Sequence, residues 1–224
     1  MKAFRKASVL AACIVFLCAG FASASYLDLG NESTYPIYVS VNGVQQTAAR
    51  AGSYTASLDG VALEFLYCVD FFKTVKLDTD YKSTVVNRDG VLYGEPVRNA
   101  DQVAWLLDNY GVGGNGNDAA ALQAAIWNVV STPEKVVTLD SRAGAAQLGY
   151  YETYLDGLAA ALNVGETGNV SDYYWITPGT ENKYGGLIEY QGLVGASPVP
   201  VPAAAWLLGA GLFGLVGIRR KARN

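Results

Sequence analysis

The period of the hydrophobic pattern changes near the middle of the chain, and this change constrains the fold more than any single motif. From Tyr26 to Gly94, short β-rich stretches are separated by turn signals such as Asn42-Gly43, a pattern typical of strands and hairpins. After Asn99, apolar residues recur every three or four positions, as in amphipathic helices. We therefore expect an α+β fold: a β-rich sandwich or barrel body with a helical insertion.

The boundaries of the expected elements follow from these patterns. Strands are expected at residues 37–41, 54–58, 61–72, 75–77, 83–86 and 91–93, with returning strands at 173–176 and 187–190. Asn99, with Gln102 as its capping-box partner, predicts a helix over residues 100–110. A second helix is expected from about residue 117 to 130. The third, over residues 145–162, has an expected buried stripe of Leu148, Tyr151, Leu155, Leu158 and Leu162.

Both ends of the 224-residue chain are typical of processing signals. Residues 1–24 combine a basic start, an apolar run and a small-residue cleavage site, which predicts a signal peptide; an uncleaved anchor helix is the alternative. The apolar run from Ala203 to Ile218 precedes a basic cluster, and we expect one transmembrane helix there, in the inner membrane, with a buried core helix as the alternative. Residues 25–195 then form one extracellular domain, and residues 196–224 form a sorting and anchor segment.

Charge and residue types exclude several classes of function. Seven of the 16 basic residues lie in the two terminal segments, which leaves nine basic against 20 acidic residues in the domain between them. An acidic domain repels phosphate backbones, so we expect no nucleic-acid partner. The chain has no histidine, which removes Ser-His-Asp and Cys-His catalysis. We expect no enzyme activity and no cofactor; a carboxylate-based glycan hydrolase is the most distant alternative.

Two stretches rich in Asp and Asn are candidate calcium sites. Residues 78–80 and 115–118 carry side-chain oxygens, but neither has the spacing of an EF-hand. We interpret them as a turn and a helix cap, and expect no metal.

Cys68 is the one cysteine outside the predicted signal peptide. An unpaired cysteine in an exported protein is unusual. The sequence alone is compatible with a buried inert thiol or an intermolecular disulfide, and no histidine is present to activate a catalytic thiolate. On a strand, Asp70 shares the face of Cys68 and is either an aid to proton transfer or a polar residue at the strand end.

Gln123 is a polar residue in the apolar stripe of the second predicted helix. It follows Ala119 by four positions and precedes Ile126 by three, so it points with that stripe. A buried carboxamide without partners costs about 1–3 kcal/mol, so a partner is required, and the main chain is one candidate. Trp127, one turn later, is either a shield over the site or ordinary core.

The stretches around these residues resemble the thioester domains of bacterial surface adhesins. Residues 67–70 (Tyr-Cys-Val-Asp) are similar to the cysteine motif of that family, and residues 123–127 (Gln-Ala-Ala-Ile-Trp) are similar to its glutamine motif, in the same order. The resemblance covers about residues 60–195. It implies an internal thioester between Cys68 and Gln123, supported by Asp70 and Trp127.

The resemblance also implies a function and a destination. It implies a surface-anchored adhesin that attaches covalently to an amine-bearing surface or matrix protein. Residues 199–203 (Val-Pro-Val-Pro-Ala), the apolar run and the basic end resemble the PEP-CTERM sorting signal in its Val-Pro-x-Pro-Ala variant. That signal implies processing by an exosortase in a Gram-negative bacterium, with the protein anchored in the membrane or released to the cell surface or extracellular matrix. The alternative is a non-covalent structural protein of the cell surface or biofilm matrix, with Cys68 as a free thiol.

Overall fold

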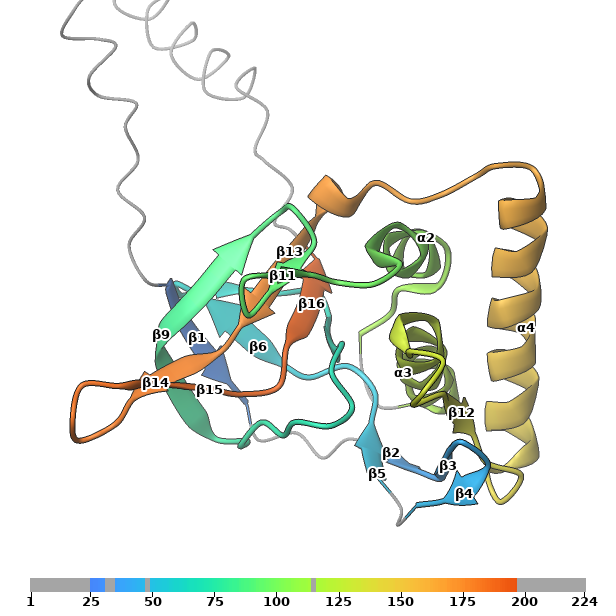
Figure 1. Cartoon of the computed structure of the whole chain (residues 1–224), viewed down its shortest axis with the longest axis horizontal. Helices are drawn as coiled ribbons and strands as arrows, with labels where there is room; N and C mark the ends of the chain where they lie inside the picture. The colour runs from blue at the N-terminus through green and yellow to red at the C-terminus, as the bar shows by residue number, and fades with distance from the viewer. Residues whose placement is uncertain (1–24, 31–34, 47–48, 114–115, 197–224) are drawn as a thin grey trace, which may run out of the picture.

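The computed structural model describes residues 25–30, 35–46, 49–113 and 116–196, and its largest element is a seven-stranded sheet (Figure 1). The strand order is β7-β6-β1-β9-β13-β16-β8, and every neighbouring pair is antiparallel. The strands are β1 Ser25–Leu29, β6 Ala56–Leu58, β7 Val61–Ala62, β8 Leu66–Cys68, β9 Thr79–Asn87, β13 Tyr173–Thr177 and β16 Leu193–Ala196.

The connection between β7 and β8 forces this sheet to roll into half a barrel. The two strands lie at opposite edges of the sheet, yet only residues 63–65 connect them. Seven strands laid flat span about 29 Å from edge to edge, whereas this connection reaches at most about 15 Å. The edges therefore approach each other, and the N–H of Tyr54, just before β6, donates to the carbonyl of Leu66 in β8 at 2.8 Å. The predicted β-rich body and the α+β class are confirmed.

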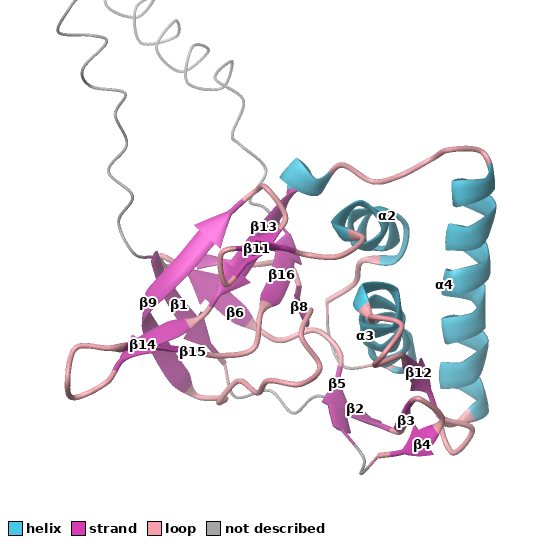
Figure 2. Cartoon of the chain, in the orientation of Figure 1, coloured by secondary structure: helices cyan, strands magenta, loops and turns pink. Residues whose placement is uncertain are grey.

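Three α-helices pack together beside the sheet, and the middle one is buried on all sides (Figure 2). They are α2 Ala100–Tyr110, α3 Asn117–Val130 and α4 Ala145–Asn163, and the 3₁₀ turn η1 Val170–Asp172 leads back to the sheet. The predicted helices match these bounds to within one residue. The helix α3 contacts α2, α4 and β8, and every residue from 119 to 127 is buried. A polar side chain in its middle turns must therefore find its partner inside the protein.

The remaining strands form small sheets around this body. The predicted turn at Asn42-Gly43 is confirmed, because both residues have positive φ, 52° and 75°, as a tight hairpin requires. The small sheets are β2 Tyr35–Ile37 with β5 Ala49–Ala51; β3 Val39–Val41 with β4 Val44–Gln45 and β12 Val137–Leu139; β10 Val91–Leu92 with β11 Glu95–Pro96; and β14 Gly179–Glu181 with β15 Leu187–Glu189.

Three of the strand predictions are wrong. The stretch 37–41 is divided between β2, which ends at Ile37, and β3 Val39–Val41, and these two strands belong to different small sheets. Residues 75–77 form no strand, because the Tyr81 hydroxyl bonds both main-chain groups of Lys76, at 2.7 and 2.9 Å, in place of a neighbouring strand. The stretch 61–72 is not one strand but is divided between β7 and β8. Its residues belong to strands at the two opposite edges of the rolled sheet, and a continuous apolar stretch in the sequence does not show where one strand ends and the next begins.

The predicted capping box at Asn99 is also wrong, although the helix begins where expected. Asn99 has a left-handed φ of 52° and makes no side-chain cap. Its carboxamide donates instead to the carbonyl of Val129 at 2.8 Å. That carbonyl lies in the last turn of α3, where helix carbonyls lack an intrahelical partner.

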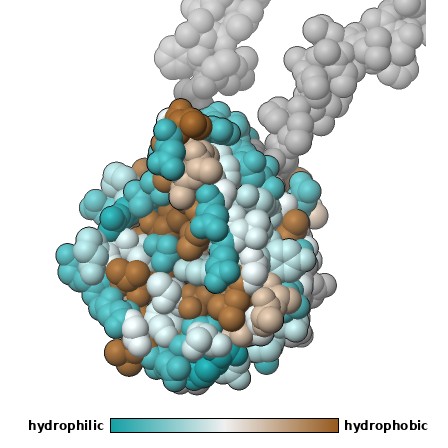
Figure 3. All heavy atoms as spheres, turned by 90° about the vertical axis from the view of Figure 1, so that its right-hand side faces the viewer, coloured by the Kyte–Doolittle hydropathy of each residue, from teal (hydrophilic) through white to brown (hydrophobic). Residues whose placement is uncertain are grey.

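The buried seam of α4 shares Tyr151 and Leu158 with the predicted stripe, and its other members differ. Leu162 is 38 % exposed, and Leu148 and Leu155 are only half-buried. Figure 3 views the side of the molecule that carries α4, where apolar side chains are interspersed among polar ones. Three of the buried residues, Gln147, Tyr151 and Tyr154, carry a polar group at the end of the side chain. Gln147 can be buried because its Nε2 donates to the carbonyl of Pro36 at 3.2 Å. The seam consists of Gln147, Tyr151, Tyr154, Leu158 and Ala161.

None of the helices in the described part of the chain is both long enough and apolar enough to cross a membrane. The predicted signal peptide at residues 1–24 and the predicted transmembrane helix at residues 203–218 lie outside the described residues, as does all but the first residue of the predicted segment 196–224.

Candidate functional site

The Cys68 main chain and the Gln123 side chain meet at the contact between β8 and α3. The N–H of Cys68 donates to Oε1 of Gln123 at 2.8 Å, and Nε2 of Gln123 donates to the carbonyl of Cys68 at 2.6 Å. Each residue is only 1 % exposed. The two residues singled out in the sequence are therefore brought together, although 55 positions separate them.

This pair of bonds exists because β8 is an edge strand. On one side β8 pairs with β16, and the N–H of Val69 donates to the carbonyl of Gly192 at 2.8 Å. The main-chain groups of Cys68 point to the other side, where the sheet has no further strand. The Gln123 carboxamide supplies one acceptor and one donor there, which is what the peptide group of another strand would supply.

The neighbouring main-chain groups of β8 are satisfied by residues that the sequence analysis did not single out. The N–H of Leu66 donates to Oγ of Ser53 at 3.0 Å, and the carbonyl of Leu66 accepts from the N–H of Tyr54 at 2.8 Å. The outer side of this edge is thus closed by two separate parts of the chain. Gln123 is one component of that closure, next to the segment that carries Tyr54.

The Cys68 thiol contacts one titratable side chain. Its Sγ donates to the Tyr54 hydroxyl at 3.5 Å, and Cys68 is in no disulfide within the described residues. Burial raises the pKa of the Cys68 thiol to about 12, and burial also raises the pKa of Tyr54 far above its ordinary range. Both groups are therefore protonated at neutral pH, and sulfur can act as a nucleophile only if its proton is transferred during attack.

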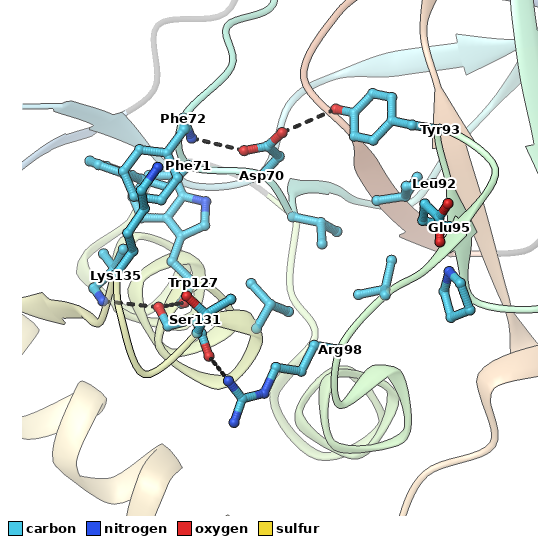
Figure 4. A pocket seen from close by; sticks show the side chains of 16 residues that line it. Asp70, Phe71, Phe72, Leu92, Tyr93, Glu95, Arg98, Trp127, Ser131 and Lys135 are labelled. Atoms are coloured by element: carbon cyan, nitrogen blue, oxygen red, sulfur yellow. Dashed lines mark hydrogen bonds between the residues drawn. The ribbon is translucent and has the colours of Figure 1, made fainter.

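Asp70 lies two residues past the cysteine, beyond the end of β8. Its Oδ1 accepts the N–H of Phe72 at 2.9 Å, and its Oδ2 accepts the Tyr93 hydroxyl at 3.4 Å (Figure 4). Its main-chain carbonyl accepts from Nε2 of Gln191. Asp70 therefore stabilises the turn after β8, and within the described residues its carboxylate has no hydrogen bond to Cys68 or Gln123.

Trp127 is 3 % exposed and lies one turn after Gln123 on α3. Phe71 packs against it edge to face, with ring centroids 4.9 Å apart, as Figure 4 shows. The indole N–H has no hydrogen-bond partner among the residues that the structure describes. Trp127 thus excludes water from this region at the cost of one unpaired donor.

Two pockets flank the Phe71–Trp127 pair, and both rings line each of them. The first, of about 300 Å³, is shown in Figure 4 and contains Asp70. The second, of about 240 Å³, is lined by Tyr54, whose hydroxyl contacts the thiol. Neither Cys68 nor Gln123 lines either pocket, and both residues are buried.

The stretches considered for calcium have local roles. Asp78 has a left-handed φ of 53° just before β9. The expected helix cap at residues 115–118 is wrong, because the N-cap of α3 is Gly116 and no side chain in the described part of the chain caps the helix; Oδ1 of Asp118 instead accepts the N–H of Ala119 at 2.8 Å within the first turn. No group of three or more metal-ligating side chains gathers within the described ranges.

Chemically, the arrangement suits acyl transfer between a sulfur and a carboxamide. Oε1 of Gln123 already accepts an N–H, so negative charge that develops on this oxygen would be stabilised. The sulfur belongs to the residue that donates this N–H. The same two hydrogen bonds also satisfy the carboxamide without any covalent bond, as expected if Gln123 is only a buried glutamine bonded to the main chain. Comparisons of the chain with protein-family models, with curated proteins and with solved structures find no match.

Proposed function

We propose that Cys68 and Gln123 form an internal thioester and that the protein uses it to attach covalently to amine-bearing partners, as an adhesin. The observation that carries this proposal is the pair of hydrogen bonds between the Gln123 carboxamide and the Cys68 main chain, in a site from which water is excluded. The local resemblance of the two motifs to thioester domains supports the same assignment.

Formation of the bond is an exchange of sulfur for nitrogen at Cδ of Gln123. Sγ of Cys68 attacks Cδ, the new Sγ–Cδ bond forms, and the Cδ–Nε2 bond breaks. The thiol proton passes through the Tyr54 hydroxyl to the departing nitrogen, which leaves as ammonia. The N–H of Cys68 stabilises the oxyanion of the tetrahedral intermediate.

Attachment reverses the roles of sulfur and nitrogen. A primary amine of the partner attacks Cδ, an amide bond to Gln123 forms, and the Cδ–Sγ bond breaks. The proton lost by the amine returns to Sγ and leaves Cys68 as a thiol. The resulting bond is not subject to the limits of non-covalent affinity. Until a partner arrives, Trp127 and Phe71 protect the thioester from hydrolysis.

The two ends of the chain complete the proposal. Residues 1–24 direct export, and residues 196–224 act as a PEP-CTERM-type sorting segment whose apolar run holds the protein in the inner membrane until an exosortase acts. The protein then remains at the cell surface or enters the extracellular matrix of a Gram-negative bacterium.

The second candidate is a structural cell-surface or biofilm-matrix protein with a free Cys68 thiol. One observation favours it: the hydrogen bonds of Gln123 already satisfy the outer side of β8 without a covalent bond. In that case the glutamine serves only to join the helix to the sheet.

The intact mass of the purified protein distinguishes the two candidates. We expect a mass one ammonia below that calculated from the sequence, and methylamine should raise it by one methylamine while it exposes one thiol. The Cys68→Ala variant is the matched control and should show neither change. A full calculated mass, with a thiol that reacts once the protein is denatured, would establish the structural alternative.

A further inference from the structure

The pocket lined by Tyr54 lies one side chain away from the Cys68 thiol. Tyr54 lines this pocket and its hydroxyl lies 3.5 Å from Sγ of Cys68. Trp127, one turn from Gln123 on the same helix, lines the pocket as well. The pocket therefore reaches the immediate neighbours of both reacting side chains. We call it the Tyr54 pocket; the other is the Asp70 pocket.

The charges that line the two pockets differ. Arg50 and Lys73 line the Tyr54 pocket, both are exposed, and no carboxylate lies among its described lining residues. Lys73 places its Nζ 3.1 Å from the centre of the ring of Tyr93, a residue of the Asp70 pocket, and it makes no ion pair within the described residues. The Asp70 pocket carries both signs, since Asp70 and Glu95 face Arg98 and Lys135.

A doubly basic pocket disfavours a simple cationic ligand. In a domain with nine basic and 20 acidic residues, two cations without a carboxylate between them are a local exception. Arg and Lys side chains in such a position bind carboxylates and phosphates through charge-assisted hydrogen bonds. An ammonium group with no other charge is repelled, whereas an amine that carries its own anion is held with its nitrogen close to the thioester.

We propose that the Tyr54 pocket admits the attacking nucleophile and that its preferred substrate is a primary amine with a carboxylate or phosphate a few bonds away. Arg50 and Lys73 bind the anionic group, and the neutral amine nitrogen reaches Cδ of Gln123 beside Tyr54. This inference rests on the proposed thioester. The step is the aminolysis described above: the N–Cδ bond forms, the Cδ–Sγ bond breaks and the amine proton passes to sulfur.

The test compares aminolysis rates of the full-length protein by intact mass, with each amine supplied at the same concentration of the species that carries one free amino group, which for ethylenediamine is the monocation. Ethanolamine is the neutral reference, and ethylenediamine is the cationic probe. O-phosphoethanolamine and β-alanine supply the phosphate and the carboxylate, so their relative rates identify which anion the pocket prefers. We expect at least one of these anionic amines to react about threefold to tenfold faster than ethanolamine, the range expected for two partly exposed ion pairs. The advantage should shrink as salt is added.

Variants separate the two pockets. The double variant Arg50→Gln/Lys73→Gln should lose the preference for anionic amines, so that their rates relative to ethanolamine fall to about one. The double variant Arg50→Glu/Lys73→Glu should favour ethylenediamine instead. The matched control, Arg98→Gln/Lys135→Gln, removes two cations from the Asp70 pocket and should leave the preference unchanged.

The outcomes distinguish this inference from the proposed function. If the protein shows no loss of ammonia, the thioester itself is wrong. If the thioester reacts with methylamine but neutral, anionic and cationic amines react at equal rates, only the charge preference is wrong. If the Arg98/Lys135 variant alone abolishes the preference, the nucleophile enters through the Asp70 pocket and the assignment of the Tyr54 pocket is overturned.

Discussion

The Gln123 carboxamide pairs with the main chain of Cys68 as a neighbouring strand would, with one hydrogen bond accepted at 2.8 Å and one donated at 2.6 Å. This contact joins the central helix α3 to the edge strand β8 of the rolled sheet. It also holds the carboxamide against the main chain of the residue that carries the thiol, and each of the two residues is only 1 % exposed. The predictions below separate its structural contribution from its chemical one.

The structural contribution of Gln123 can be measured in a protein that forms no thioester. In a Cys68→Ser background, Gln123→Ala leaves two buried main-chain groups unsatisfied and should lower the free energy of unfolding by about 2–4 kcal/mol. Gln147→Ala is the matched control, because that buried glutamine makes one main-chain hydrogen bond and should cost about 1 kcal/mol. Urea denaturation measures both. Equal costs for the two variants would argue against the strand-like role of Gln123.

The role of Tyr54 in proton transfer predicts a kinetic defect without a large loss of stability. Tyr54→Phe removes the hydroxyl that contacts Sγ and should slow both thioester formation and aminolysis about tenfold or more, because general acid–base groups contribute at least that much. Mass spectrometry of freshly refolded protein follows formation. Tyr67→Phe is the control: its hydroxyl bonds the carbonyl of Val112 at 2.6 Å, away from the thiol. If both variants are equally slow, the effect of Tyr54 is structural.

The aromatic pair over the site predicts the lifetime of the thioester in water. Phe71→Ala removes the ring that packs on Trp127 and should shorten that lifetime several-fold, while costing about 1–2 kcal/mol of stability. The neighbouring Phe72→Ala is the control, since Phe72 is 54 % exposed. Loss of the ammonia-deficient species over time, followed by intact mass, reports hydrolysis. An unchanged lifetime in Phe71→Ala would show that the pair does not exclude water.

The raised pKa of the Cys68 thiol predicts a pH dependence that only the free thiol shows. Burial raises the pKa of the folded Cys68 thiol to about 12 from an ordinary value of 9.0, and Gln123→Ala should keep this thiol free to titrate. Below pH 9 both folded and unfolded states are protonated, so the thiol adds no pH dependence. Between pH 9 and 12 the unfolded state loses its proton first, so stability falls as pH rises, by about 1.4 kcal/mol per pH unit.

Subtraction isolates this thiol from the tyrosines that also titrate at high pH. The double variant Cys68→Ser/Gln123→Ala retains those tyrosines but has no thiol, so the difference between the two denaturation series is the contribution of Cys68. Parallel series with no difference above pH 9 would show that the thiol is accessible to solvent.

The helices were predictable because their signal is local. The period of 3.6 residues places the bounds of α2, α3 and α4 within one residue of those found. The same periodicity placed Gln123 in the interior, and the structure shows it buried. Its partner could be proposed only through the resemblance of the two motifs, because no pattern within one chain relates a helix position to a strand 55 residues away.

The errors arise where a residue's role depends on distant chain segments. The sequence predicts Asn99 as a helix cap, but its carboxamide donates a hydrogen bond to the carbonyl of Val129 instead. Tyr54 carried no sequence signal, since a tyrosine in a β-rich stretch is ordinary core, yet it is the side chain that reaches the thiol. The division of residues 61–72 between two sheet edges likewise depends on the roll of the whole sheet.

The position of β16 has a mechanical consequence. This strand lies between β13 and β8, and the sequence beyond residue 196 continues directly from it. A force applied to the chain beyond residue 196 acts along β16. It therefore loads the hydrogen bonds to β13 and to β8 simultaneously in shear, instead of breaking them one after another. Cys68 lies on the next strand and Gln123 just beyond it, so under the proposed attachment the tension between residues 197–224 and a partner bound at Gln123 would have only a short path through the sheet.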